Sequence, residues 1–150
     1  MPAWITIAVT DLRPLMLAEQ LDALRTEALA PGQPDPFTEI APSVIAKVRA
    51  YIASNPENRV DANLATVPPE LKIDVGYLIL APMMIRLGQP LSADQQKQVE
   101  IAHSTLVALR EKKLLVSKPD AAIAPDVQGG GASAIVRNSS CITGDSLRGL

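Results

Sequence analysis

Prolines limit how long any regular element of this chain can be. The chain has 13 prolines among 150 residues. A proline inside a helix removes one backbone hydrogen bond and clashes with the carbonyl four residues earlier. Three of them fall in Ala30–Pro36, a stretch with the composition of a loop. We therefore expect several short elements joined by stiff connectors.

The composition favours helices packed on helices. Apolar residues make up 47% of the chain, and only four of them are aromatic, namely Trp4, Phe37, Tyr51 and Tyr77. A core built from Leu, Ile, Val, Ala and Met suits helix packing better than a β-sandwich or barrel. The length corresponds to one ordinary domain with room for an appendage.

Charge and targeting signals argue against several classes of protein. Sixteen acidic and fourteen basic residues give a net charge of −2, so the sequence does not indicate non-specific nucleic-acid binding. The only cysteine, Cys141, excludes an internal disulfide framework. The N-terminal sequence does not show the basic region followed by an apolar run that marks a signal peptide. The longest apolar run, Val75–Ile85, has about half of the ~20 residues of a membrane helix. We expect a soluble protein that folds in a reducing compartment.

The first part of the chain combines an extended segment with helical periodicity. Trp4–Thr10 is β-branched and too short to be independent, so it must lie against another part of the protein. Thr10 is the expected N-cap of the first helix, with Asp11 in its first turn. A second helical stretch covers Leu17–Leu29, and whether residues 11–29 form one helix or two stays open. Its predicted apolar stripe is Leu17, Leu21, Leu24 and Ala28.

The clearest amphipathic helix spans Phe37–Ser54. Lys47 and Arg49 are expected to point away from its apolar stripe, and Glu57–Val67 is expected to form a packed surface loop. The stripe is Val44, Ile45, Val48, Tyr51 and Ile52, and the loop's apolar anchors are Val60, Leu64 and Val67.

Two further helices complete the predicted core. Leu71–Leu87 is apolar nearly all round, which is typical of a buried central helix, and Pro82 is expected to kink or end it. Ser92 and Gln95 form a capping box that opens a helix to about Lys113. Leu114–Val116 could be a short strand or a last packed turn. The stripe of the last helix is Val99, Ala102, Leu106 and Leu109.

The predicted fold class is all-α: a small bundle of four to five helices with a short N-terminal extended segment. The helical core domain covers residues 1–118, and residues 119–150 form an extended or flexible C-terminal arm without helical period. Spaced apolar residues in the arm suit docking along a partner, although a disordered tail without a role is the alternative. These docking residues are Ile135, Val136, Ile142, Leu147 and Leu150.

Gly144–Leu147 spells the nucleophile block of one family of serine esterases. A catalytic serine needs a base within reach and donors for the oxyanion. No histidine follows Ser146, and the only histidine, His103, lies inside a predicted helix, where we expect it to be partly buried and hydrogen-bonded. Cys141 has no paired cysteine, and no metal-ligand spacing is present. We therefore expect no enzyme, no cofactor and no metal site.

The order of the segments resembles the small neck proteins of Mu-like tailed bacteriophages. Members of that family often end in a stretch similar to Phe-Thr-Arg-Asp-Ser-Leu-Lys-Gly-Leu, from which this chain departs at Ile142 and Gly144. The segments that carry the resemblance are Val9–Leu12, Val44–Ser54, Val67–Leu80, Ala108–Val116 and Ile142–Leu150.

The resemblance implies a head–tail connector, or adaptor, of the virion neck, assembled in the host cytoplasm. Such subunits form a ring, commonly of twelve copies, under the portal protein. The ring extends the channel, lets packaged DNA pass without specific recognition, and presents a surface to a stopper or tail-terminator protein, with no membrane involved. The arm would be a strap on a neighbouring subunit or the portal. The alternative is a small helical regulatory or scaffolding protein that acts through protein–protein contacts.

Overall fold

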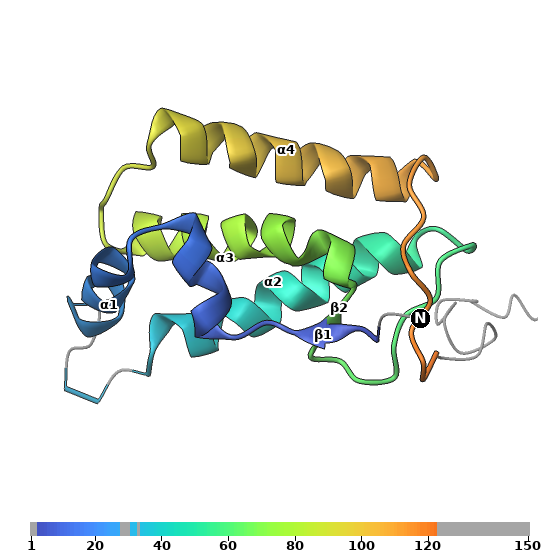
Figure 1. Cartoon of the computed structure of the whole chain (residues 1–150), viewed down its shortest axis with the longest axis horizontal. Helices are drawn as coiled ribbons and strands as arrows, with labels where there is room; N and C mark the ends of the chain where they lie inside the picture. Colours follow the sequence, from blue (N-terminus) through green and yellow to red (C-terminus); the bar gives the residue numbers. More distant parts are fainter. Residues whose placement is uncertain (1–2, 28–30, 33, 123–150) are drawn as a thin grey trace, which may run out of the picture.

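The computed structural model describes residues 3–27, 31–32 and 34–122. These residues form a small helical bundle, which confirms the predicted fold class. In Figure 1, α3 (Lys72–Arg86) runs between α2 (Pro36–Ala53) and α4 (Ala93–Arg110), and all three helices contact one another. A short 3-10 helix, η2 (Pro69–Leu71), leads into α3. The bundle therefore has a central helix, as the apolar pattern predicts.

The N-terminal residues pack along the bundle as a strand and two short helices. Strand β1 (Ile5–Thr6) pairs antiparallel with β2 (Thr66–Val67), which supplies the neighbour that the extended segment needs. The 3-10 helix η1 (Val9–Leu15) and helix α1 (Ala18–Glu27) follow as separate elements. Residues 11–27 thus form two helices.

The prediction that Thr10 caps the first helix is wrong. Helix η1 begins at Val9, two residues before the predicted start, with Ala8 at the N-cap position, and the backbone N–H of Ala8 donates to Asp11 Oδ2 at 2.8 Å. The Asp11 carboxylate also pairs with Lys72 at 2.7 Å, which ties η1 to the start of α3. Asp11, rather than Thr10, therefore provides the side-chain acceptor for a backbone N–H at the start of η1.

Two predicted apolar anchors are exposed. Leu17, just before α1, is 69% exposed, and Leu64 in the 57–67 loop is 75% exposed. The other members of each set that the structure describes are buried: Leu21, Leu24, Val60 and Val67.

The helix ends follow local chemistry. The Asp35 carboxylate accepts the N–H of Phe37 at 3.0 Å at the start of α2. The capping box of α4 is confirmed, since Gln95 N–H donates to Ser92 Oγ and Ser92 N–H donates to Gln95 Oε1. This helix ends at Arg110, three residues before the predicted end. Two residues after the helix, Lys112 has a positive φ of 62°.

Helix α3 continues through Pro82 to Arg86, so the proline does not end it. Near its start, Gly76 lets η1 approach closely, because a Cβ atom there would lie 2.6 Å from Leu15 Cδ1. After α4, residues 114–116 form neither a strand nor a helical turn.

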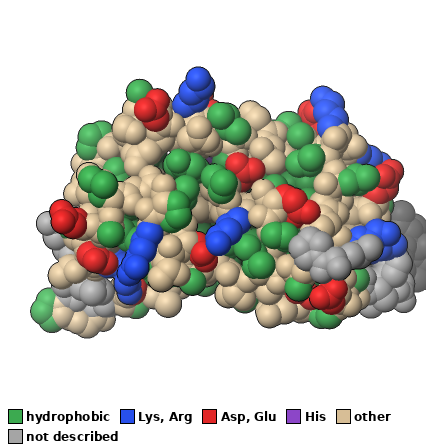
Figure 2. Space-filling model, viewed as in Figure 1, with side chains coloured by type: hydrophobic (Ala, Val, Ile, Leu, Met, Phe, Trp, Pro, Cys, Tyr) green, Lys and Arg blue, Asp and Glu red, His purple; other side chains and the backbone are tan. Residues whose placement is uncertain are grey.

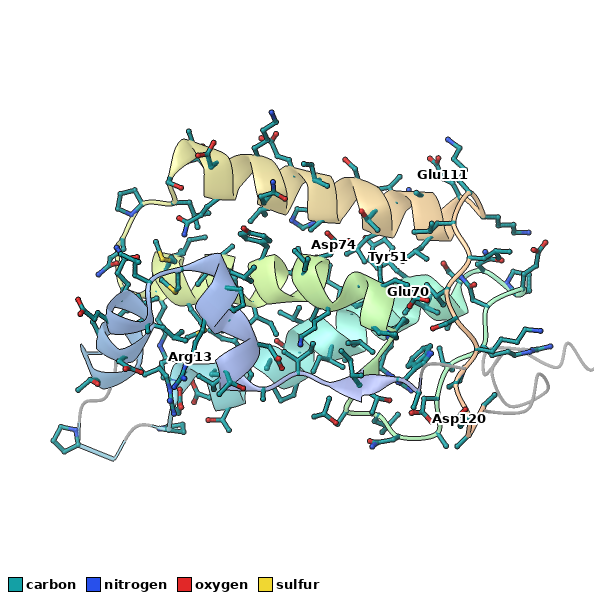
Figure 3. All side chains as sticks on the ribbon, in the orientation of Figure 1. Arg13, Tyr51, Glu70, Asp74, Glu111 and Asp120 are labelled. Atoms are coloured by element: carbon teal, nitrogen blue, oxygen red, sulfur yellow. The ribbon has the colours of Figure 1, made fainter. Side chains whose placement is uncertain are left out.

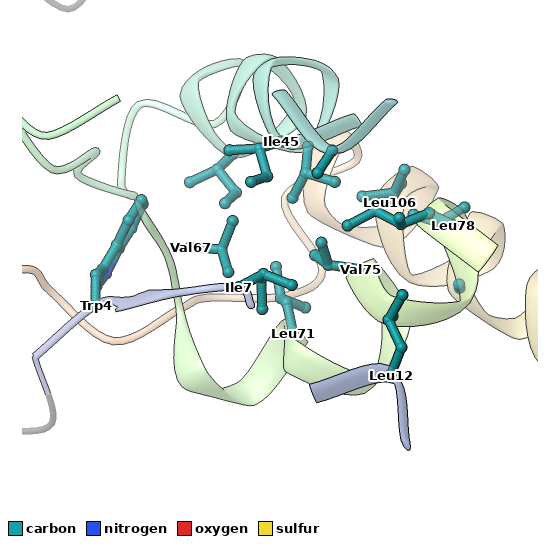
Figure 4. Close-up of a cluster of buried hydrophobic side chains, with 14 of the residues drawn as sticks. Trp4, Ile7, Leu12, Ile45, Val67, Leu71, Val75, Leu78 and Leu106 are labelled. Atoms are coloured by element: carbon teal, nitrogen blue, oxygen red, sulfur yellow. The ribbon is translucent and has the colours of Figure 1, made fainter. Parts of the chain in front are cut away.

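The core lies between α2, α3 and α4 and extends to the β1–β2 pair (Figure 4). It is aliphatic apart from Trp4 and Phe37, as the composition predicts. None of the helices in the described part of the chain is long and apolar enough to span a bilayer. The core residues labelled in Figure 4 are Trp4, Ile7, Leu12, Ile45, Val67, Leu71, Val75, Leu78 and Leu106.

Candidate functional site: an exit clasp and an apolar groove

Arg49 is a buried arginine near the C-terminal end of α2. It is only 7% exposed, so the prediction that it points away from the core is wrong, whereas Lys47 is exposed. Arg49 follows Ile45 by four residues and precedes Ile52 by three, which is the spacing of the buried stripe. That spacing indicates a buried position for Arg49, although a charged side chain by itself favours an exposed one.

The guanidinium of Arg49 is held by backbone carbonyls and an aromatic ring. It donates to the carbonyl of Thr66 at 2.9 Å and to that of Asp61, and its Cζ lies 5.4 Å from the centre of the Trp4 ring. Burial lowers the pKa of Arg49 and the charge of Asp61 opposes this shift. An arginine pKa starts so far above neutrality that the group stays charged.

Arg49 therefore fixes the shape of the 57–67 loop from inside. Its two carbonyl acceptors stand at the middle and near the end of that loop, and the Thr66 hydroxyl donates to Asp61 Oδ2 at 2.7 Å. Thr66 also begins β2, which pairs with β1. A buried charge is tolerated only when it is well hydrogen-bonded, so the loop conformation and the burial of Arg49 depend on each other.

The chain leaves the bundle along this same loop. The indole N–H of Trp4 donates to the carbonyl of Ser117 at 2.9 Å, and the N–H of Val116 donates to Asn58 Oδ1 at 3.1 Å. Further on, the N–H of Ala62 donates to the carbonyl of Ala121 at 2.8 Å.

An antiparallel bridge between Asp61 and Ala122 completes the arrangement, and Pro119 is buried. In Figure 1 the start of the chain and this outgoing segment meet at the same end of the bundle. We call Trp4, Arg49, Asn58 and Asp61 the exit clasp, because together they fix where the C-terminal segment begins.

Of the predicted arm, the structure describes the first four residues, 119–122, and Ala121 and Ala122 pair with the 57–67 loop. The rest of the arm, residues 123–150, lies outside the described residues, together with Cys141 and Ser146. The division at residue 118 therefore stays a prediction. The same holds for the proposed docking residues, Ile135, Val136, Ile142, Leu147 and Leu150.

An apolar groove of about 390 Å³ lies beside the clasp. Strand β1, helix α2 and the tip of the 57–67 loop form its walls. A second groove of about 390 Å³ lies between α2, α3 and α4 and includes Val44, Ile85 and His103. We call the groove beside the clasp the β1–α2 groove. Its lining includes Ile7, Phe37, Ala41, Pro42, Ile45 and Leu64.

His103 is exposed, so the expectation of a partly buried histidine is wrong. The stripe residues Ala102 and Leu106 take the buried positions next to it on α4. Within the described ranges, no group of three or more His, Cys, Asp or Glu side chains could hold a metal ion. On the face drawn in Figure 2, Lys and Arg side chains are interspersed with Asp and Glu.

Asp74 is a half-buried carboxylate in the first turn of α3. Figure 3 shows it on the side of α3 that faces α4. Burial raises the pKa of Asp74, and the hydrogen bond from Thr105 opposes the rise. The residue joins two helices but lies apart from the exit clasp.

No known protein family, curated protein or solved structure matches this chain.

Replacing Arg49 tests whether the clasp stabilises the fold. Arg49→Ala leaves the buried carbonyls of Asp61 and Thr66 without their donors and opens a cavity, so the free energy of unfolding should fall by about 2–4 kcal/mol. Lys47→Ala, on the exposed side of the same helix, should change it by less than about 0.5 kcal/mol. Urea denaturation measures both values, and equal effects would contradict the role of Arg49.

Replacing Asp74 tests the cost of its partial burial. A raised pKa in the folded state means that the charged form is disfavoured there, so this group lowers stability as the pH rises above the pKa of the unfolded chain. Asp74→Asn should therefore raise the unfolding temperature at pH 7 and have little effect near pH 3. The positive end of the α3 dipole favours the charge, so the gain should stay below about 1 kcal/mol. A loss of stability at pH 7 would contradict this.

Proposed function

We propose that this protein is a structural virion protein, a head–tail connector subunit that forms a ring under the portal, extends the DNA channel and links capsid to tail. The observation that supports this most is the fixed exit of the C-terminal segment. A rigid clasp sets the position from which 28 residues beyond Ala122 can reach a partner. In this proposal the protein acts in the virion neck through contacts, without catalysis.

Exposed hydrophobic side chains are compatible with neighbours in a ring. Ile73 is 61% exposed at the start of α3, Ile85 is 70% exposed at its end, and Leu115 is 59% exposed after α4. A subunit between two neighbours would cover part of such a surface. This favours an assembly, without fixing the number of copies.

The mixed surface charge fits a channel for DNA. The net charge is −2, and side chains of both signs are interspersed on the face of Figure 2. A wall of this kind would not hold the phosphate backbone by counterion release, so DNA could slide past it. The partners in this proposal are other copies of the chain, the portal protein and a stopper or tail-terminator protein.

Co-expression with the portal protein of the same genome tests the proposal. The full-length chain should co-purify with the portal as a ring-shaped complex visible in electron micrographs. A chain truncated after Ala122 should fold, because it retains the Ala62–Ala121 hydrogen bond, but it should not bind. Circular dichroism and thermal unfolding of the truncated chain provide the folding control.

Two results would contradict the connector proposal. If the truncated chain bound the portal as well as the full-length chain, the segment would not be the strap. If the full-length chain stayed a monomer or dimer and did not bind the portal protein, the regulatory or scaffolding alternative would be favoured.

A further inference from the structure

The β1–α2 groove is an apolar surface with room for a short run of side chains. Its volume of about 390 Å³ lies at the small end of the range for ligand pockets. Phe37, Ala41 and Ile45 line it and are themselves buried, while Leu64, which also lines it, is 75% exposed. An exposed leucine beside an apolar hollow can gain free energy when another apolar side chain covers both.

The C-terminal segment begins next to this groove. Ala62 hydrogen-bonds Ala121, and Ala62 is two residues from the lining residue Leu64, so at most about 7 Å of backbone separates this hydrogen bond from the groove. The 28 residues after Ala122 can span up to about 90 Å when extended, which is ample for a return to the groove. None of the residues that line the second groove belongs to β1 or the 57–67 loop.

We propose that the β1–α2 groove is the resting site of this chain's own C-terminal segment, residues 123–150, in the isolated protein. The apolar residues of the segment fill the groove, and the segment and groove cover each other until a partner takes the segment. The inference does not rest on the connector proposal, since it concerns the chain alone.

Effective concentration favours the chain's own segment over that of a second copy. A flexible tether holds a ligand near its site at a concentration in the mM range. A segment that binds with a Kd of about 1 mM as a free peptide would then be docked about half of the time. In a solution of roughly 0.05 mM protein, the same affinity would fill only about 5% of the grooves with segments from other copies.

The single cysteine offers a direct probe. A nitroxide on Cys141, beside the predicted docking residue Ile142, broadens the amide signals of whatever lies near it. In the full-length chain, the amides of Thr38, Ala46 and Ala65 at the groove should lose intensity strongly, and this loss should persist on dilution. The amides of Ile85 and His103 at the second groove should not.

Matched variants on α2 separate docking from an effect on the fold. Ala46 lines the groove, whereas Ala50, one turn later, does not, and both are exposed. Ala46→Glu places a charge where apolar side chains would dock, so it should abolish the broadening. Ala50→Glu should preserve it, and both variants should keep the amide spectrum of the rest of the bundle.

Three outcomes would overturn the proposal. Broadening that spreads evenly or centres on the second groove would show that the segment has another site or none. Broadening in a mixture of nitroxide-labelled and isotope-labelled chains would assign the groove to a second copy. Broadening that persists in Ala46→Glu would show that the segment does not dock in the β1–α2 groove.

Discussion

The burial of one positive charge organises this protein. Arg49 is buried, and an unpaired guanidinium would be costly there. Its donors go to the carbonyls of Asp61 and Thr66, and its Cζ lies over the Trp4 ring. The 57–67 loop must therefore hold one conformation. That conformation places Thr66 and Val67 opposite β1 and turns Asn58 and Ala62 toward the outgoing chain. Strand pairing, the loop and the exit of the chain consequently share one cause.

This arrangement gives a small bundle a fixed point of attachment. The three long helices provide a rigid base, and the clasp sets where the C-terminal segment starts at one end of it. A tethered segment with a fixed origin searches a small volume, which raises its effective concentration near any site within reach. The proposed connector function and the proposed resting site in the β1–α2 groove both use this property. They differ in the partner that receives the segment.

Much of the fold could be predicted from the sequence, because local patterns set it. The capping box at Ser92, the central position of α3 and the aliphatic core follow from spacing and composition. The exit clasp could not be predicted, since it joins residues as distant as Trp4 and Ser117, and no local pattern encodes such a pairing. Arg49 occupies a buried position of the α2 stripe, although a charged residue type predicts exposure. The predicted docking residues, from Ile135 to Leu150, lie outside the described residues and stay a prediction.

Hydrogen exchange of two backbone amides tests the clasp most directly. The amides of Val116 and Ala62 have their partners in Asn58 and Ala121, far away in the sequence. Both should be protected in the wild-type protein and should lose protection together in Arg49→Met, while amides in the middle of α4 keep theirs. If these two amides exchanged in the wild-type protein as fast as an unstructured chain, the outgoing segment would not be held, and the role assigned to Arg49 would be wrong.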